Sequence, residues 1–469
     1  MKMKYIIYLF VVLFATTSCE DFLNITPDGQ AKRDELLATQ QGIEDAMYGV
    51  YSQMRSTTLY GQELYFHTLE ILAHNLECKD NTTLEPLANF EFDNTDVKSL
   101  FEGIWTAMYS NISNVNSVLD APLVAEAKEF PYTIYRGEAL GLRAFMHFDL
   151  VRLFAEQYTV NPEADGIPYA TDFSLKTPDF ESLAKNYEHI LTDLHEAEAL
   201  LDNENEYENV GNYMLDRQIH FNKYAVWATL ARVYLTMGDK DNAEKYADMV
   251  ITDGKYMLKE KTEVVNDLAG VISKKECLFG IYHAGFYTQV SAKLQQMTSF
   301  YSLDLPKEFL KLYEKEASGS DFRTMAYFSE SGTGSSSKPR LCKFTDVYEL
   351  NNNVASRPSD LILGINMIRI PEMYYILAEV MLEKDPKTAL EYYNAVRKHR
   401  GLEAVEKSLT IEMINDERCK EMVGEGQIYF NLKRQNRSID AYDGNNTVYK
   451  PSDGIYAIPV PDIEKDNRN

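Results

Sequence analysis

One segment of the chain, residues 223–251, constrains the fold more than any other because it predicts two helices packed against each other. Its sequence is KYAVWATLARVYLTMGDKDNAEKYADMVI. Spacings of three and four residues place one apolar set on a single helical face: Trp227, Leu230, Ala231 and Tyr234. Gly238-Asp239 is a turn signal between the two helices. Small residues in the second half, at Ala243 and Ala247, allow the helices to approach closely.

This pattern is that of a tetratricopeptide repeat, in which a Trp is followed by a Leu, a small residue and an aromatic residue at fixed spacings. A second helix pair with similar spacing runs from Tyr374 to Arg400 and carries Pro386 in its turn. Residues 252–373 separate the two pairs, so the chain is not a continuous array of repeats. The prediction is an all-α fold, a tetratricopeptide-like scaffold of scattered helix pairs around a loop-rich insertion.

Helical periodicity also predicts helices over residues 40–55, 97–119 and 137–158, and a further helix beginning at Thr177-Pro178. Gly and Pro are scarce, with 23 and 15 among 469 residues, and this favours a mostly helical chain. The 137–158 segment is apolar almost all round, which predicts burial. Arg143 and Arg152 within it therefore need acidic partners.

The insertion between the two helix pairs, residues 265–365, has a different composition. It is rich in aromatic residues and holds the SGTGSSSKP run at 331–339. A flat aromatic ring can cover the apolar face of a sugar while amide and carboxylate groups bind its hydroxyls. With the polar loop at 78–96, the insertion supplies the predicted ligand-binding residues, Asp80, Asn81, Tyr282, Tyr287, Phe300, Tyr301 and Tyr327. The alternative for each aromatic residue is a place in the local core.

The first thirty residues predict export. Lys2 and Lys4 precede an apolar run from Tyr5 to Ala15, and Cys19 follows small polar residues. Eleven apolar residues are too few for a membrane-spanning helix, which needs roughly 20, but they suit a signal peptide. A Cys at the junction resembles a bacterial lipobox, in which the Cys is acylated and becomes the first mature residue, although Thr16 stands where a Leu is usual. The alternative is an ordinary signal peptide with a Cys there by chance.

The net charge and the sequence motifs exclude several classes of function. The formal net charge is −25, and such a surface repels nucleic acid. The motifs of serine hydrolases, zinc proteases and P-loop enzymes are missing from the sequence, and the spacings of the eight histidines predict neither metal nor cofactor. Paired carboxylates could hydrolyse glycosides, but 72 acidic residues single out no pair. The cysteines after Cys19 form no metal or redox motif, and their pairing stays open: Cys78, Cys277, Cys342 and Cys419.

Six segments of the chain, taken in order, carry recognisable motifs: CEDFLNITP, GEALGLRAFMHFDLVRLF, NYEHILTDLHEAEALL, IRIPEMYYILAEVML, NDERCKEMVGEGQIYFNLKR and YAIPVPDIEKDN. Together they resemble the SusD/RagB-like lipoproteins of Bacteroidetes. Gln427 and Asn431 replace an Arg and an Asp that are usual in the fifth segment. We interpret four charged residues of that segment as a structural ion network: Glu417, Arg418, Glu421 and Glu425.

The resemblance implies a non-catalytic lipoprotein on the surface of the outer membrane, anchored through Cys19. It implies a glycan ligand, less often a peptide, and delivery to a SusC-like TonB-dependent transporter, with no cofactor. The corresponding organisation is a signal peptide at 1–18, an N-terminal helical region at 19–260 and a C-terminal region at 261–469. Three alternatives stay open: a peptide-binding RagB-like protein, a surface glycoside hydrolase and a protein-binding scaffold. Binding residues vary widely in the family, so no ligand contact is transferred from it.

Overall fold

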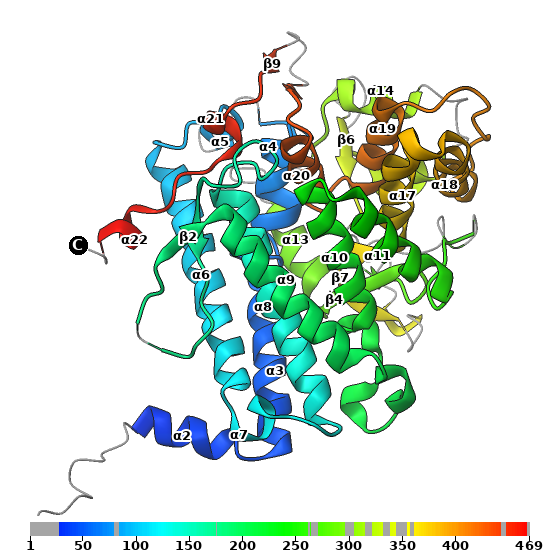
Figure 1. Cartoon of the computed structure of the whole chain (residues 1–469). Coiled ribbons are helices and arrows are strands. Elements are labelled where there is room, and N and C mark those ends of the chain that lie inside the picture. Colours follow the sequence, from blue (N-terminus) through cyan, green and yellow to red (C-terminus); the bar gives the residue numbers. More distant parts are fainter. Residues whose placement is uncertain are drawn as a thin grey trace, which may run out of the picture.

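The protein is built on a row of packed helices (Figure 1). The computed structural model describes residues 28–466 except 79–83, 175, 261–262, 264–270, 296–303, 315–320, 332–337, 344–353, 357–360 and 442–446. The predicted all-α fold class is confirmed, since helices dominate and the strands are short. In Figure 1 the row runs from the blue and cyan helices to the orange α18 on the right.

Each helix of the row packs against the next one. In packing order the row consists of α3 (Gln40–Met54), α6 (Thr95–Leu119), α8 (Tyr132–Phe154), α9 (Leu183–Leu201), α10 (Lys223–Met237), α11 (Lys240–Asp253), α17 (Ile370–Lys384) and α18 (Pro386–His399). The two predicted tetratricopeptide pairs are α10/α11 and α17/α18. Although a long insertion separates them in sequence, α11 packs directly against α17. The pairs are therefore continuous in space, and the expectation of scattered pairs is wrong on this point.

Local sequence signals explain where these helices begin and end. The side chain of Asn222 accepts hydrogen bonds from two backbone N–H groups at the start of α10, as an N-cap residue does. Gly238 ends α10 with φ +81°, a left-handed conformation that favours glycine. Asp385 caps α18, and Pro386 occupies its first turn.

The prediction of a helix start at Thr177-Pro178 is wrong. Residues Phe180–Ser182 form strand β2, which pairs antiparallel with β1 (Asp165–Pro168). The helix begins afterwards, at Leu183, where the Ser182 hydroxyl accepts a hydrogen bond from the backbone N–H of Lys185. Ser182 is thus the N-cap, and Pro178 lies in the segment before the strand.

Helix α8 is buried on nearly all sides, as its composition predicts. The acidic partners expected for Arg143 and Arg152 are present. Arg143 binds the carboxylate of Asp193 on α9 through two N–H···O bonds of 2.7 Å, and Arg152 pairs with Asp149 one turn earlier on α8. These ion pairs allow a charged helix to lie at the centre of the row.

The insertion joins α11 to α17 and is folded against the row. Its three-stranded antiparallel sheet has the order β3-β7-β4, with β3 (Val271–Ile272), β4 (Cys277–Tyr282) and β7 (Ile362–Arg369). Strand β7 leads into α17 without a gap. The other described elements of the insertion are α13 (Phe286–Gln295), α14 (Lys307–Glu314), α15 (Arg323–Tyr327), β5 (Phe328–Ser331), β6 (Lys338–Leu341) and η7 (Val354–Ser356).

The remaining elements precede α10 or follow α18 in the sequence. Those before α10 are α2 (Asp28–Leu36), η2 (Leu64–Thr68), α4 (Leu69–Leu72), α5 (Leu84–Ala88), α7 (Pro122–Ala125), η3 (Glu204–Tyr207), η4 (Asn212–Met214) and η5 (Arg217–Ile219). Those after α18 are α19 (Ile411–Met422), α20 (Gln427–Arg434), β8 (Ile439–Asp440), β9 (Val448–Tyr449), α21 (Asp453–Tyr456) and α22 (Asp462–Asp466).

One hydrophobic core cluster contains residues from both predicted regions, 19–260 and 261–469; the boundary at 260 stays a prediction. Among the described residues, no helix is long and apolar enough to cross a membrane. The four described cysteines, 78, 277, 342 and 419, are free thiols.

Candidate functional site

The beginning of the insertion lies along the segment 55–77, and this strip of surface is the candidate ligand-binding face. The guanidinium of Arg55 lies 3.5 Å from the carbonyl oxygen of Tyr282. The Gln289 side chain donates a hydrogen bond of 3.1 Å to the Gly61 carbonyl. The rings of Phe66 and Phe286 meet edge to face, with centroids 5.7 Å apart. Further along, the Glu77 N–H donates to the Asp304 carbonyl at 2.8 Å.

The last of these contacts brings together the two parts of the chain that the sequence predicts to bind ligand, the 78–96 loop and the insertion. Glu77 precedes the 78–96 loop, and Asp304 lies shortly after Phe300 and Tyr301. Arg340 on β6 fixes this junction, because its side chain donates to the Asp304 carboxylate at 3.0 Å. The described flanks of both predicted segments therefore lie side by side. Asp80, Asn81, Phe300 and Tyr301 themselves fall outside the described residues, as does Cys19.

Of the three predicted tyrosines that the structure describes, two lie at the surface. Tyr282, at the end of β4, is 47% exposed. Tyr287, in the first turn of α13, is half-buried. Tyr327 is different, because it is only 9% exposed and its hydroxyl lies 3.3 Å from the Glu421 carboxylate. Its ring faces the core, so it is placed to stabilise the interior and not to contact a ligand.

Polar side chains accompany Tyr282 on the candidate face. His283 follows it directly, and its Nε2 atom lies 3.3 Å from the side-chain oxygen of Gln289. Burial lowers the pKa of His283 below its usual value, so the ring is neutral at neutral pH. A neutral imidazole can donate one hydrogen bond and accept another. The face thus combines an exposed ring with uncharged donors and acceptors.

Most other aromatic residues of the insertion belong to the core. Phe279 is fully buried between Phe145 of α8 and Phe221, at centroid distances of 5.8 Å and 5.1 Å. Four more are buried in the same way: Phe286, Phe309, Tyr313 and Phe322. For these residues the alternative of a local core is confirmed.

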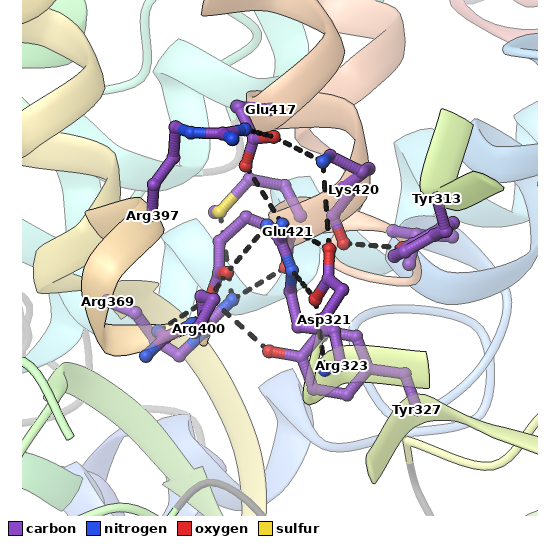
Figure 2. Close-up of polar contacts among 12 residues, drawn as sticks. Tyr313, Asp321, Arg323, Tyr327, Arg369, Arg397, Arg400, Glu417, Lys420 and Glu421 are labelled. Atoms are coloured by element: carbon purple, nitrogen blue, oxygen red, sulfur yellow. Dashed lines mark hydrogen bonds and ion pairs between the residues drawn. The ribbon is translucent and has the colours of Figure 1, made fainter. Parts of the chain in front are cut away.

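The charged residues of the fifth family-like segment form a buried ion network (Figure 2). The Glu421 carboxylate accepts hydrogen bonds from Arg369 at 2.7 Å and from Arg400 at 2.9 Å, and Arg323 approaches it at 3.3 Å. Burial alone would raise the pKa of Glu421, but Arg400 and Arg369 hold it well below its usual value. This carboxylate is therefore ionised at neutral pH and surrounded by cations.

The network extends over several elements. Glu417 binds Arg323 at 2.9 Å and Arg397 at 3.0 Å. Arg369 also reaches Glu425, at 2.7 Å, and so joins β7 to the turn after α19. Arg418 lies outside this cluster and pairs with Glu379 of α17 at 2.9 Å. The predicted ion network is therefore present, in two parts. Carboxylates held ionised in this way suit a structural role and are poorly suited to donating protons.

A further buried carboxyl group, Glu70, was not predicted. It accepts hydrogen bonds from the Gly426 N–H at 3.0 Å and the Asn75 amide at 2.7 Å. Burial raises the pKa of Glu70 to about 7, against the opposing effect of these hydrogen bonds. Gly426 has φ +69°, and a Cβ atom there would lie 2.9 Å from the Tyr65 Cα. The only signal in the sequence was an acidic residue inside the apolar run LEIL.

In the described part of the chain, no group of three or more His, Cys, Asp or Glu side chains is arranged to hold a metal ion. The sequence-based expectation of no cofactor stays a prediction.

Comparisons with known proteins agree with this architecture. A family model described as "Starch-binding associating with outer membrane" matches residues 21–235, and the SusD family model matches residues 232–462. The SusD-like protein P2 of Formosa agariphila is 23% identical, over 98% of this chain and 97% of that protein.

Solved structures show the same fold. A SusD superfamily protein from Bacteroides thetaiotaomicron has a TM-score of 0.75 at 23% identity, covering 91% of this chain and 98% of that one. A SusD-like carbohydrate binding protein from Bacteroides vulgatus has a TM-score of 0.69 at 20% identity, with 90% and 95% covered. Surface glycan-binding protein A from B. thetaiotaomicron has a TM-score of 0.66 at 19% identity, with 92% and 98% covered.

The helix row with its inserted sheet and loops defines a tetratricopeptide-like protein that carries a separate, irregular face. Two family models that together span residues 21–462 make the classification specific. The chain belongs to the SusD/RagB family.

Proposed function

We propose that this protein captures glycans at the cell surface and delivers them to a SusC-like TonB-dependent transporter without cleaving them. The observation that carries the proposal is the exposed Tyr282 on a face where the flanks of the 78–96 loop and the insertion meet. Family membership supports it, as do fold relatives that are named glycan-binding or carbohydrate binding proteins.

The chemistry of this face suits a neutral, hydroxyl-rich ligand. An exposed tyrosine ring can bury the C–H face of a sugar. The neutral His283 and the Gln289 amide can exchange hydrogen bonds with hydroxyl groups. The net charge of −25 disfavours anionic ligands such as nucleic acid.

Binding and turnover should be measured together on a panel of defined oligosaccharides. We expect calorimetry to detect binding to at least one glycan, and chromatography of the same mixtures to show no products after prolonged incubation. Products would favour the surface glycoside hydrolase. Binding restricted to peptides would favour the RagB-like alternative, and binding of neither would favour a protein-binding scaffold.

The proposed attachment to the outer membrane depends on Cys19. We expect Cys19→Ala to move the protein from the membrane fraction to the soluble fraction of the cells that express it. Cys78→Ala is the matched control, because it removes a thiol and leaves the junction intact. Continued membrane fractionation of Cys19→Ala would contradict lipid anchoring at this residue. Co-purification of the wild type with a SusC-like transporter would test the proposed partner.

A further inference from the structure

Four arginines line one small cavity between helices of the row and two later helices, α19 and α20. The cavity lies among α8, α10, α17, α19 and α20, and its volume is about 30 Å³. A cavity of roughly 10–15 Å³ on the same measure holds one water-sized particle. Its charged and amide lining residues are Arg152, Arg232, Arg418, Arg434, Glu372, Gln427 and Asn431.

The carboxylates bound to these arginines are fewer than the arginines. Arg232 binds Glu372 through two contacts of 2.6 Å. Arg418 and Arg434 share one carboxylate, that of Glu379, at 2.9 Å and 2.7 Å.

The fourth arginine, Arg152, pairs with Asp149. Four guanidinium groups are thus paired with three carboxylates in the described part of the chain. One positive charge is left without a counterion in a buried place, which is costly unless an anion compensates it.

Several N–H groups of the same side chains are also unpaired. Arg152, Arg232 and Arg418 are 6%, 3% and 4% exposed. Within the described residues, the Nε atom of Arg152, the Nη1 atom of Arg232 and both Nε and Nη2 of Arg418 are buried and have no acceptor. A buried donor that is left unsatisfied lowers the stability of the fold.

The remaining polar groups at the cavity do not supply the missing charge. The side-chain oxygen of Asn431 accepts from Arg418 and Arg434, at 2.6 Å each. The side-chain oxygen of Gln427 accepts from Arg152 at 3.3 Å. Both are neutral amides, so they satisfy some donors and leave the excess positive charge in place.

We propose that this cavity binds one small monovalent inorganic anion, of the size of a halide ion. The volume excludes a sugar or a peptide side chain, and the surplus charge with four buried donors favours an anion over a water molecule. Such an ion would join α10 and α17 of the helix row to α19 and α20, which follow the row in the chain. It would therefore stabilise the fold and leave glycan binding unchanged.

Bromide is a direct probe, because its anomalous scattering identifies the ion. In crystals of the wild-type protein grown or soaked in sodium bromide, we expect an anomalous peak in this cavity, within hydrogen-bond distance of Arg418. An anomalous peak in the cavity of the bromide crystal would support the site if the same cavity shows no anomalous peak in a bromide-free crystal. Ordinary density without an anomalous signal would identify water and would overturn the proposal.

A variant that carries its own anion tests the same idea in solution. Asn431→Asp places a carboxylate between Arg418 and Arg434. Asn209→Asp adds the same charge on an exposed loop and is the matched control. In sodium gluconate we expect Asn431→Asp to melt about 2 °C or more above the wild type.

Halide should then distinguish the two variants at constant ionic strength. Replacing gluconate by bromide should raise the melting temperature of the wild type and of Asn209→Asp, and should have little effect on Asn431→Asp. An identical bromide response in all three proteins would mean that the ion acts elsewhere, and would overturn the proposal.

Discussion

Two tyrosines of the same insertion, Tyr282 and Tyr327, have opposite environments. Tyr282 is 47% exposed at the end of β4, and Tyr327 is 9% exposed against a buried ion network. The register explains the first case, because Tyr282 lies opposite Gly364 at the end of the ladder and no side chain faces it across the strands. Tyr327 is buried because it closely follows Asp321 and Arg323 in the sequence, and the ion pair between these two residues lies in the network. Charged neighbours, more than aromatic character, separate a core tyrosine from a candidate ligand contact.

The largest effect is expected where the network loses its central carboxylate. Glu421→Gln removes the one carboxylate that Arg323, Arg369 and Arg400 share, so fewer negative charges compensate these buried cations. We expect a loss of about 3–5 kcal/mol in the free energy of unfolding, measured with urea. Glu412→Gln, at an exposed position of the same helix, is the matched control and should stay close to the wild type. Equal stability of the two variants would show that the network contributes little.

A second buried carboxyl group, Glu70, differs from Glu421 in its surroundings. The hydrogen-bond donors of Glu70 are neutral, whereas those of Glu421 are arginines. The pKa of Glu70 is raised to about 7, so the folded state holds the proton more tightly than the unfolded chain, in which the value is near 4.5. The stability that this group contributes is complete below pH 4.5 and is lost as the pH rises to 7.

We therefore expect Glu70→Gln to change the pH profile of stability. Relative to the variant, the wild type should lose about 2 kcal/mol between pH 4.5 and 7, because each pKa unit corresponds to about 1.4 kcal/mol. Urea unfolding of both proteins across this range measures the difference, and Glu91→Gln at an exposed position is the control. Parallel profiles for wild type and Glu70→Gln would mean that the group titrates normally.

The smallest effects come from the two tyrosines themselves, and they should separate binding from stability. Tyr282→Ala should weaken glycan affinity about fivefold, near 1 kcal/mol, with an unchanged melting temperature. Tyr327→Phe should lower stability by about 1 kcal/mol through the lost hydrogen bond to Glu421 and leave affinity unchanged. Calorimetry and thermal melting on both variants give the comparison. Unchanged affinity in Tyr282→Ala would remove this residue from the proposed site.

Local patterns in the sequence are sufficient to predict the helix pairs, because a tetratricopeptide unit is defined by spacings within about thirty residues. They could not show that α11 packs against α17, since that contact depends on how the insertion returns the chain. The helix start near Pro178 was misplaced because the β1–β2 pairing, which no local pattern reveals, occupies the residues before Ser182.

The site was predicted less completely than the fold. Aromatic residues in the insertion were identified as possible ligand contacts, but burial divides them, and burial depends on distant partners such as Phe145 and Phe221. The ion network was expected from the resemblance, whereas two of its partners come from elsewhere: Arg323 lies outside the six segments, and Arg369 lies in the fourth one. Glu70 was missed because a single acidic residue in an apolar run does not indicate which N–H groups it will meet.

The direct packing of α11 on α17 has a consequence for how such a chain can diversify. Both ends of the insertion are fixed by helices that already touch, so the intervening segment only has to leave and return to adjacent points. Doubling the length of a flexible loop costs only about 0.6 kcal/mol of closure entropy. Lengthening, shortening or replacing the exposed parts of this segment is therefore inexpensive for the scaffold, which leaves ligand preference free to change while the architecture persists.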